Sequence, residues 1–444
     1  MHCRQQNFNI NRKMVLYSKL LCFAKRPAFK TAGLYTFSHF LTKGISFFLL
    51  FIYTNPAYIS VDENGLISLM NSAVLLLSPF LALGTIQSAS ADYFRMQRNE
   101  FKDFFTTGFF APILVMLLGM ATMFVFKGRL SAAYGFPVAF IFVVPLMAFF
   151  SFCNELYVVI MRNSDDPVRY FKVAMWRILL EVGLSLLLVV VFALRWKGRV
   201  AGIMATNVFI LTGAYFYFRQ QGLLFGKIKI QYIKQELVYA VPVIAMQCSV
   251  FVLSASDKFF LSSFTNNAAV GIYGYACVFA AMVSFACSSV ISFIMPKIYS
   301  CLSQPYVDYK LLKKYFLFYS GFCLMALIGV ISTGPFLYKY LINEKYYSGL
   351  SYMFLIAIGY FFWNVGYFFI SFLLYYKQKK KILLLSLLAV CISACSNYFF
   401  IKNFGERGAA VSTCAAYLAV LILILLFNYK TVRNIFFEKQ TIQS

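Results

Sequence analysis

Apolar stretches as long as a membrane crossing recur along the whole chain, and short polar connections separate them. A transmembrane helix needs ~20 mostly apolar residues. Twelve segments of the sequence meet this requirement: 31–54, 66–88, 104–126, 136–161, 171–194, 200–218, 236–260, 270–295, 315–338, 350–375, 382–401 and 408–428. Because every connection is short, the pattern predicts an all-α polytopic membrane protein without an inserted soluble domain.

Two pairs of short sequences repeat at an offset of about 206 residues, roughly half the chain. Residues 196–203, before the sixth span, resemble residues 403–410, before the twelfth. Residues 63–67, before the second span, resemble residues 269–273, before the eighth. Because six spans per half is an even number, both halves enter the membrane in the same direction. We therefore expect two six-helix lobes, related by an axis along the membrane normal, with a central cavity between them.

This repeat divides the chain into five parts. They are a basic amino-terminal tail (1–30), an N-lobe (31–218), a basic linker (219–235), a C-lobe (236–428) and a carboxyl-terminal tail (429–444).

Composition supports a membrane protein and narrows the possible partners. Of the 444 residues, 61% are hydrophobic and 12% are charged, whereas soluble domains are ~45–50% apolar and ~25% charged. The formal net charge is +25. The cations lie between apolar runs and form no nucleic-acid-binding motif, so we expect contact with anionic membrane lipid and no nucleic-acid partner.

The distribution of Lys and Arg predicts the orientation of the chain. The two tails and the loops on their side carry 28 of these residues, and the loops on the opposite side carry 9. By the positive-inside rule, both termini are cytoplasmic. One loop disagrees, because Arg195, Lys197 and Arg199 would lie outside.

Cysteine and histidine give no sign of a metal site. Most of the 11 cysteines lie within apolar runs, where cysteine behaves as a small hydrophobic residue. The sequence has no CxxC motif and only two histidines. We therefore expect neither a metal nor another cofactor.

Polar residues recur at helical spacing within several spans, so that they share one helix face. The stripes are Tyr35, His39, Lys43 and Ser46; Asn71, Ser78 and Thr85; Gln247, Ser254 and Lys258; Tyr360, Asn364, Tyr367 and Ser371; and Ser386, Ser393 and Asn397. Together they predict a polar lining of the central cavity. The alternative is hydrogen bonding between packed helices, which uses the same residue types.

Charged residues inside the spans are the main candidates for function, because a charge near the bilayer centre costs ~2.5–3.5 kcal/mol on insertion scales. Lys43 is predicted ~18 Å into its span, close to the midplane. His39 lies one turn earlier, and an unperturbed histidine changes its charge near neutral pH. Lys258 is placed near the outer end of its span. We therefore name Lys43, His39 and Lys258 as candidate substrate contacts, together with Asn71, Gln247, Asn364 and Arg177.

Two carboxylates are candidates for ion coupling or gating. Glu181 follows Arg177 by four residues, a spacing that predicts a salt bridge within one helix. In the alternative reading, Glu181 couples to protons when a substrate engages Arg177. Asp257 lies beside Lys258 and is expected to close an outer gate or to pair with neighbouring residues.

The order and spacing of several motifs resemble those of a known transporter family. In the second half these are Pro242, Gln247, residues 256–261 and residues 270–273; the first half has corresponding segments at 65–67, 83–85 and 101–105. The chain resembles, over nearly its whole length, the Wzx-like polysaccharide flippases of the multidrug/oligosaccharidyl-lipid/polysaccharide exporter superfamily. One departure is Asp92, at a position where many relatives carry Arg.

The resemblance implies movement of undecaprenyl-diphosphate-linked oligosaccharide across the bacterial inner membrane by alternating access, for O-antigen or other surface polysaccharide assembly. It implies membrane lipid and the polysaccharide polymerase machinery as partners, with a proton or sodium ion as the coupling ion. Lys43 and Arg177 would supply cations for the diphosphate.

Two other functions remain open from the sequence. A drug exporter of the same superfamily would carry carboxylates in its cavity, whereas the deep charge of the first span is Lys43. A polytopic polymerase or ligase would need a large outside loop, and the predicted outside loops have about a dozen residues or fewer. The sequence has no P-loop, so ATP hydrolysis is not a built-in energy source.

Overall fold

The computed structural model describes residues 49–164 and 166–437, apart from the side chains of Ala91, Gln235, Val238, Tyr239 and Pro242. These residues form helices and turns, with no strand among them. Ten of the helices are long and apolar enough to cross a membrane. The predicted all-α polytopic fold class is confirmed. Of the first predicted span, 31–54, all but the last residues lie outside the described part of the chain.

The described part of the N-lobe contains eight α-helices and one π-helical turn. They are α3 (Leu50–Tyr53), α4 (Val61–Ala82), α5 (Thr85–Asp92), α6 (Arg98–Val125), α7 (Lys127–Tyr134), α8 (Phe140–Asn163), α9 (Pro167–Leu186), η1 (Leu187–Val191) and α10 (Arg195–Gln220). Helices α4 and α9 begin with common N-terminal caps. Ser60 and Glu63 form a capping box at the start of α4, and Asp166 caps α9 just before Pro167.

The C-lobe follows with longer helices. They are α11 (Ile230–Phe264), α12 (Asn267–Leu302), α13 (Tyr309–Leu341), the 3-10 turn η2 (Glu344–Tyr346), α14 (Gly349–Tyr375), α15 (Lys379–Phe427) and α16 (Tyr429–Phe436). The core of this lobe is rich in buried aromatic rings, including Tyr273, Phe279, Tyr319 and Phe368.

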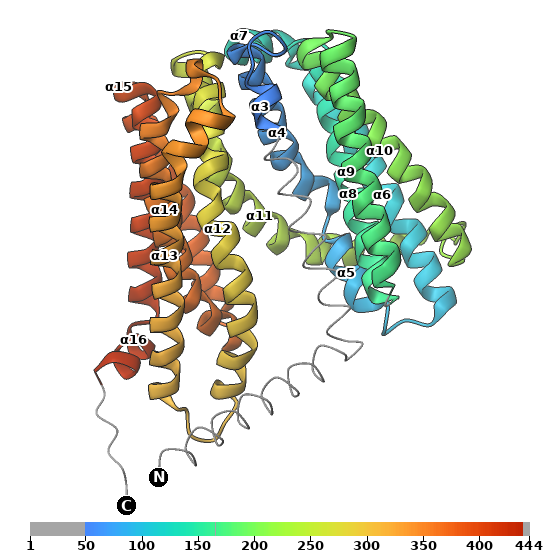
Figure 1. Ribbon diagram of the computed structural model, residues 1–444. Helices are drawn as coiled ribbons and strands as arrows, with labels where there is room; N and C mark the ends of the chain where they lie inside the picture. Colours follow the sequence, from blue (N-terminus) through green and yellow to red (C-terminus); the bar gives the residue numbers. More distant parts are fainter. Residues whose placement is uncertain (1–48, 165, 438–444) are drawn as a thin grey trace, which may run out of the picture.

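The two lobes stand side by side and diverge along their length (Figure 1). They come together at the end where α7 and η2 lie, which we call the α7 end. They are farther apart at the end where α16 and the α12–α13 turn lie, which we call the α16 end. Helices α4 and α11 lie between the two bundles, and α4 packs against both α12 and α11.

Of two breaks in the helices, one departs from the predicted spans and one agrees with them. The second predicted span, 66–88, is interrupted because Leu83 and Gly84 both have positive φ, so α4 ends and α5 begins there. Glycine adopts this conformation without the Cβ penalty. The predicted spans 382–401 and 408–428 are the two arms of α15, which reverses direction at Gly405 (φ 55°, ψ −129°). A hydrogen bond of 2.7 Å between Ser412 and Asn397 confirms that the arms lie side by side.

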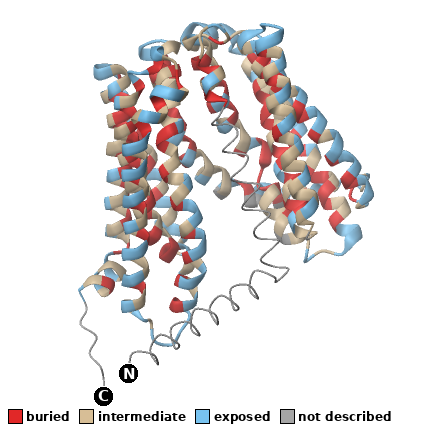
Figure 2. Ribbon diagram, viewed as in Figure 1, coloured by how far each residue is buried: buried red, intermediate tan, exposed pale blue. Residues whose placement is uncertain are grey.

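The outward faces of the helices carry large apolar side chains, as a lipid-facing surface requires. Figure 2 shows exposed residues along the outer faces of both bundles. On α6, for example, Leu114 is 51% exposed, Leu117 is 53% exposed and Leu118 is 58% exposed. Exposure of this extent on a soluble surface would be an aggregation liability. The described chain is a multi-pass membrane protein.

Candidate functional site

Helix α11 belongs to both lobes, and this sets the geometry of the site. Its first turns pack on the N-lobe, where Lys229 lies 2.8 Å from Asp103 of α6 and the Tyr232 ring meets Phe104 edge to face. Its second half packs on α15. In Figure 1, α11 runs obliquely from the region of α5 toward the C-lobe. A movement of one lobe relative to the other must therefore bend or displace α11.

Several candidate substrate residues lie on the helices between the lobes. Asn71 of α4 is exposed. On α11, Ser254 is exposed, and Gln247 and Lys258 are half-buried. Lys258 makes no ion pair with any residue that the structure describes. We call Asn71 of α4 together with Gln247, Ser254 and Lys258 of α11 the interlobe polar face, after the position of these two helices between the bundles; their amide, hydroxyl and ammonium groups can bind a ligand.

Asn364 does not belong to this face. It is only 5% exposed, and its amide donates to Ser284 at 2.9 Å and to the Tyr360 carbonyl at 2.7 Å. Ser371, from the same predicted stripe, is fully buried. The structure therefore places Asn364 in the packing between α12 and α14, and its role as a substrate contact remains a prediction. The alternative reading of the stripes, hydrogen bonding between helices, applies here.

Asp257 is the centre of a buried hydrogen-bond network in the C-lobe. It is 5% exposed. Its Oδ2 accepts from the Tyr273 hydroxyl and, at 3.4 Å, from Thr413, while its Oδ1 accepts from the Lys258 backbone N–H at 2.9 Å. Tyr273 and Thr413 hydroxyls are also 3.0 Å apart. Both carboxylate oxygens are thus bonded, and α11, α12 and the second arm of α15 meet at this group.

The network continues through the first arm of α15. Asn397 donates to the Ser256 hydroxyl at 3.1 Å and accepts from Ser412 at 2.7 Å. Ser393 donates to the Val252 carbonyl at 3.2 Å. The polar stripe predicted for the eleventh span is therefore turned toward α11 and the other arm of α15. In this conformation it joins helices within one lobe.

The predicted ion pair of Arg177 and Glu181 is not formed. Glu181 instead pairs with Arg199 of α10, at 3.2 Å. The Arg199 guanidinium also donates to Tyr53 at 2.9 Å and to Ser185 at 3.0 Å. Arg177 is half-buried and has no ion pair within the described ranges. The i, i+4 spacing permitted a pair, but a guanidinium on the neighbouring helix meets the carboxylate.

Two cations of the loop that disagreed with the positive-inside rule form ion pairs in the folded protein. Arg199 is bound by Glu181, and Arg195 pairs with Glu63 at 3.2 Å. Two of the three cations in that loop are therefore neutralised by acids of the N-lobe.

The lobes meet at the α7 end through a hydrogen-bonded contact centred on Asn64. Its amide donates to the Tyr346 hydroxyl of η2 at 2.8 Å and to the Tyr53 carbonyl at 2.8 Å. Its carbonyl accepts from the Tyr275 hydroxyl of α12 at 2.9 Å. Burial raises the pKa of Tyr346, so its phenol stays neutral and can act as acceptor. The Asn64 side chain therefore bonds to α3 of the N-lobe and to η2 and α12 of the C-lobe.

Glycines bring the two backbones together beside Asn64. A Cβ placed on Gly65 would clash with the backbone of Asn267, and one placed on Gly271 would clash with Val61 and lie 3.1 Å from the Gly65 nitrogen. Gly65 and Gly271 occupy equivalent positions of the two repeats found in the sequence. We refer to Asn64, Gly65, Asn267, Gly271 and Tyr346 as the interlobe contact. The repeated glycine was visible in the sequence, but its partner across the lobes was not.

Two of the strongest sequence candidates, His39 and Lys43, lie outside the described residues. Within the described part of the chain, no group of three or more His, Cys, Asp or Glu side chains is arranged to hold a metal ion.

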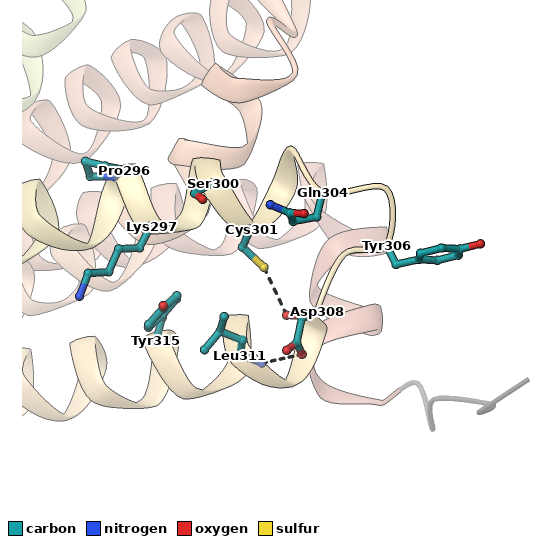
Figure 3. Close-up of a pocket in the computed structure, with 9 residues that line it drawn as sticks. All are labelled: Pro296, Lys297, Ser300, Cys301, Gln304, Tyr306, Asp308, Leu311 and Tyr315. Carbon is teal, nitrogen blue, oxygen red and sulfur yellow. Dashed lines mark hydrogen bonds between the residues drawn. The ribbon is translucent and has the colours of Figure 1, made fainter. Parts of the chain in front are cut away.

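A hollow of about 600 Å³ lies at the α16 end of the C-lobe, away from the interlobe polar face. Figure 3 shows its lining, which consists of Pro296, Lys297, Ser300, Cys301, Gln304, Tyr306, Asp308, Leu311 and Tyr315. Asp308 caps α13 by accepting from the Leu311 N–H at 3.0 Å. The hollow lies at the turn between α12 and α13, and none of the candidate site residues predicted from the sequence lines it.

The sequence matches no protein-family model, and no curated protein sequence matches it. Three solved structures are similar in fold. The lipid II flippase MurJ in an inward closed conformation has a TM-score of 0.73 and 14% identity, covering 90% of this chain and 89% of MurJ. An inward-facing multidrug resistance MATE family transporter of the MOP superfamily has a TM-score of 0.64 and 13% identity, covering 87% and 95%. The MATE multidrug transporter DinF-BH, in a ligand complex, has a TM-score of 0.61 and 16% identity, covering 91% and 96%. The chain shares the fold of these proteins.

Proposed function

We propose that this protein moves a lipid-linked oligosaccharide diphosphate from the cytoplasmic to the opposite leaflet of a membrane by alternating access. The observation that carries the proposal is the interlobe contact at the α7 end, which joins two lobes that diverge toward the α16 end. The fold shared with MurJ, a lipid II flippase, supports a lipid-linked substrate.

The charge distribution supports entry of the substrate from the cytoplasmic side. The loops at the α16 end include most of the cations that the positive-inside rule assigns to the cytoplasm. The conformation described above is then closed to the outside and open to the cytoplasm. A substrate made in the cytoplasmic leaflet would enter between the diverging lobes, and its lipid tail would stay in the bilayer.

The interlobe polar face supplies the chemistry that such a substrate needs. Lys258, a cation without an ion pair in the described part of the chain, suits a diphosphate, and Asn71, Gln247 and Ser254 suit sugar hydroxyls. His39, Lys43 and Arg177 remain proposed contacts on the same grounds as in the sequence analysis. These amide and hydroxyl groups can bind many sugars, so they do not specify which sugars the lipid carries.

Asp257 and Glu181 are proposed as the coupling and gating carboxylates. Asp257 connects three helices of the C-lobe, so binding of a proton or sodium ion there would change the packing of α11 against α12 and α15. Glu181, held by Arg199 next to Tyr53, lies close to the interlobe contact. One elementary charge moving through 100 mV provides about 2.3 kcal/mol, which suffices to bias a two-state cycle.

An ion-coupled drug exporter is the second candidate, because two of the similar structures are multidrug transporters. The buried carboxylates of α11 would then serve cation exchange. The ammonium group of Lys258 on the interlobe polar face favours an anionic substrate over a cationic drug.

Depletion of the protein in its native cells tests the proposal. A flippase predicts that lipid-linked repeat units accumulate in the cytoplasmic leaflet, while resistance to cationic dyes is unchanged. Unchanged leaflet distribution together with increased dye sensitivity would establish the drug exporter instead.

A further inference from the structure

The first turns of α11 bury a second carboxylate, Glu236, which has no role in the proposed transport cycle so far. Glu236 is 2% exposed. Neither of its carboxylate oxygens has a hydrogen-bond partner among the residues that the structure describes. Thr85, at the start of α5, is 1% exposed, and its hydroxyl oxygen is likewise unpartnered within those residues.

Glu236 and Thr85 are neighbours at the surface of α6. A Cβ placed on Gly108 would lie 2.8 Å from Thr85 Cγ2 and 3.2 Å from Glu236 Oε1. The glycine therefore makes room for the carboxyl group, and Ala240, one turn later on α11, packs in an apolar cluster with Leu83 and Ala111. A polar pair is thus enclosed by apolar side chains of α4, α6 and α11.

Glu236 makes no ion pair with any cation that the structure describes. On α11 itself, Lys234 is exposed. Asp92 ends α5, and α6 carries Arg98, Glu100, Lys102 and Asp103, the last of which is bound to Lys229 at 2.8 Å. That ion pair raises the pKa of Lys229 and occupies its ammonium. The other elements packed against α11 carry charges near their ends: Asp62 and Glu63 on α4, Lys127 and Arg129 on α7, Lys297 on α12, and Lys379, Lys380, Lys381, Lys402, Glu406 and Arg407 on α15.

Burying an isolated carboxylate is so costly that such a group takes up a proton instead. A neutral carboxyl group can donate to the Thr85 hydroxyl. One oxygen of Glu236 and the hydroxyl oxygen of Thr85 would then each have a hydrogen-bond partner. We propose that Glu236 is a proton-binding site of the N-lobe, and that the first turns of α11 stay docked against α5 and α6 only while Glu236 carries its proton.

This site has a mechanical consequence. Because α11 is held by the N-lobe at one end and by the C-lobe at the other, release of the proton weakens the attachment of α11 to the N-lobe. Water then reaches Glu236, and the anion is stabilised by hydration. Proton binding at Glu236 follows from the geometry around this side chain and does not depend on which substrate the protein carries.

Two measurements on the full-length protein in lipid nanodiscs test this. Infrared difference spectra should contain the carbonyl band of a protonated carboxyl group at neutral pH. The band should vanish in Glu236→Gln and persist in Glu100→Gln, which changes an exposed glutamate at the start of α6. A band that survives in Glu236→Gln would overturn the proposal.

Hydrogen exchange of the segment 229–241, corrected for the intrinsic effect of pH, gives the second readout. Protection in the wild type should fall about tenfold for each pH unit above the point at which Glu236 loses its proton, because one proton is linked to docking. Glu236→Gln should remain protected throughout. Equal pH dependence in both proteins would contradict the proposal, as would recovery of wild-type protection by sodium at high pH, which would identify the occupant as a metal cation.

Discussion

The two ends of α11 each bury a carboxylate, and the surroundings of the two groups are opposite. Near the α7 end, Asp257 is 5% exposed, and hydroxyl and amide donors from three helices bind both of its oxygens. At the start of the helix, Glu236 is 2% exposed and has no bonded partner within the described ranges. A carboxylate that is satisfied in this way fixes a structure. A buried carboxylate without hydrogen-bond partners is stabilised when it becomes exposed to water. We therefore assign the fixed end of α11 to the C-lobe and the movable end to the N-lobe.

The largest effect should follow from removing the satisfied carboxylate. Asp257→Ala leaves the buried hydroxyls of Tyr273 and Thr413 without their acceptor, so we expect it to lower the free energy of unfolding by about 3 kcal/mol. Thermal denaturation in detergent measures this, with Ser254→Ala, an exposed position on the same helix, as the control. Equal stability of the two variants would show that the Asp257 network does not fix the helix.

The next largest effect should come from the close backbone approach at the α7 end. Gly65→Leu forces a side chain into the backbone of Asn267, and overpacking of this kind costs about 1–3 kcal/mol. Distances between spin labels on the two lobes should then increase at the α7 end. Gly128→Leu is the matched control, because no atom lies within 4 Å of a Cβ at that position. If both variants leave the distances unchanged, the glycines do not hold the lobes together.

A smaller shift is expected from the hydrogen bonds beside those glycines. Asn64→Ala removes the amide that binds Tyr346 and the carbonyl that binds Tyr275, which should weaken the closed state by about 1 kcal/mol. The same distance measurement should show a larger open population, by about fivefold. An unchanged population would assign closure at the α7 end to the glycine packing alone.

The smallest effect on stability should come from the unsatisfied carboxylate. Glu236→Gln replaces a protonated carboxyl group with a neutral amide of similar shape, so we expect a change in the free energy of unfolding well below that of Asp257→Ala near neutral pH. At higher pH the variant should be more stable than the wild type, because only the wild type must bury a charge or undock. Thermal denaturation as a function of pH measures both. A loss as large as that of Asp257→Ala would remove the distinction between the two ends of α11.

The sequence was informative about the fold because span length and charge bias depend on local composition. The break at Gly84 rests on one backbone conformation, which an apolar pattern does not reveal, whereas the two arms of α15 on either side of Gly405 were predicted as separate spans. The equivalence of Gly65 and Gly271 was present in the repeat, yet only the folded chain brings them into contact.

Site residues were harder to predict, because the partner of a polar group depends on the neighbouring helix. Glu181 had a cation at helical spacing, but Arg199 of α10 binds it. Asn364 had the spacing of a cavity stripe, but Ser284 of α12 binds it. Glu236 gave no signal, since a glutamate at the edge of an apolar run usually remains in water. Lys43 and His39 remain predictions, as do the substrate and coupling roles of the other candidates.

Reconstitution in liposomes tests whether the protein transports a lipid-linked oligosaccharide diphosphate. Purified protein in liposomes that contain a fluorescent lipid-linked oligosaccharide diphosphate should make the label in the inner leaflet accessible to a membrane-impermeant quencher. Lys258→Ala should slow this exchange without changing thermal stability. Liposomes with the wild-type protein that remain as protected as protein-free liposomes, under an imposed proton or sodium gradient, would contradict the account.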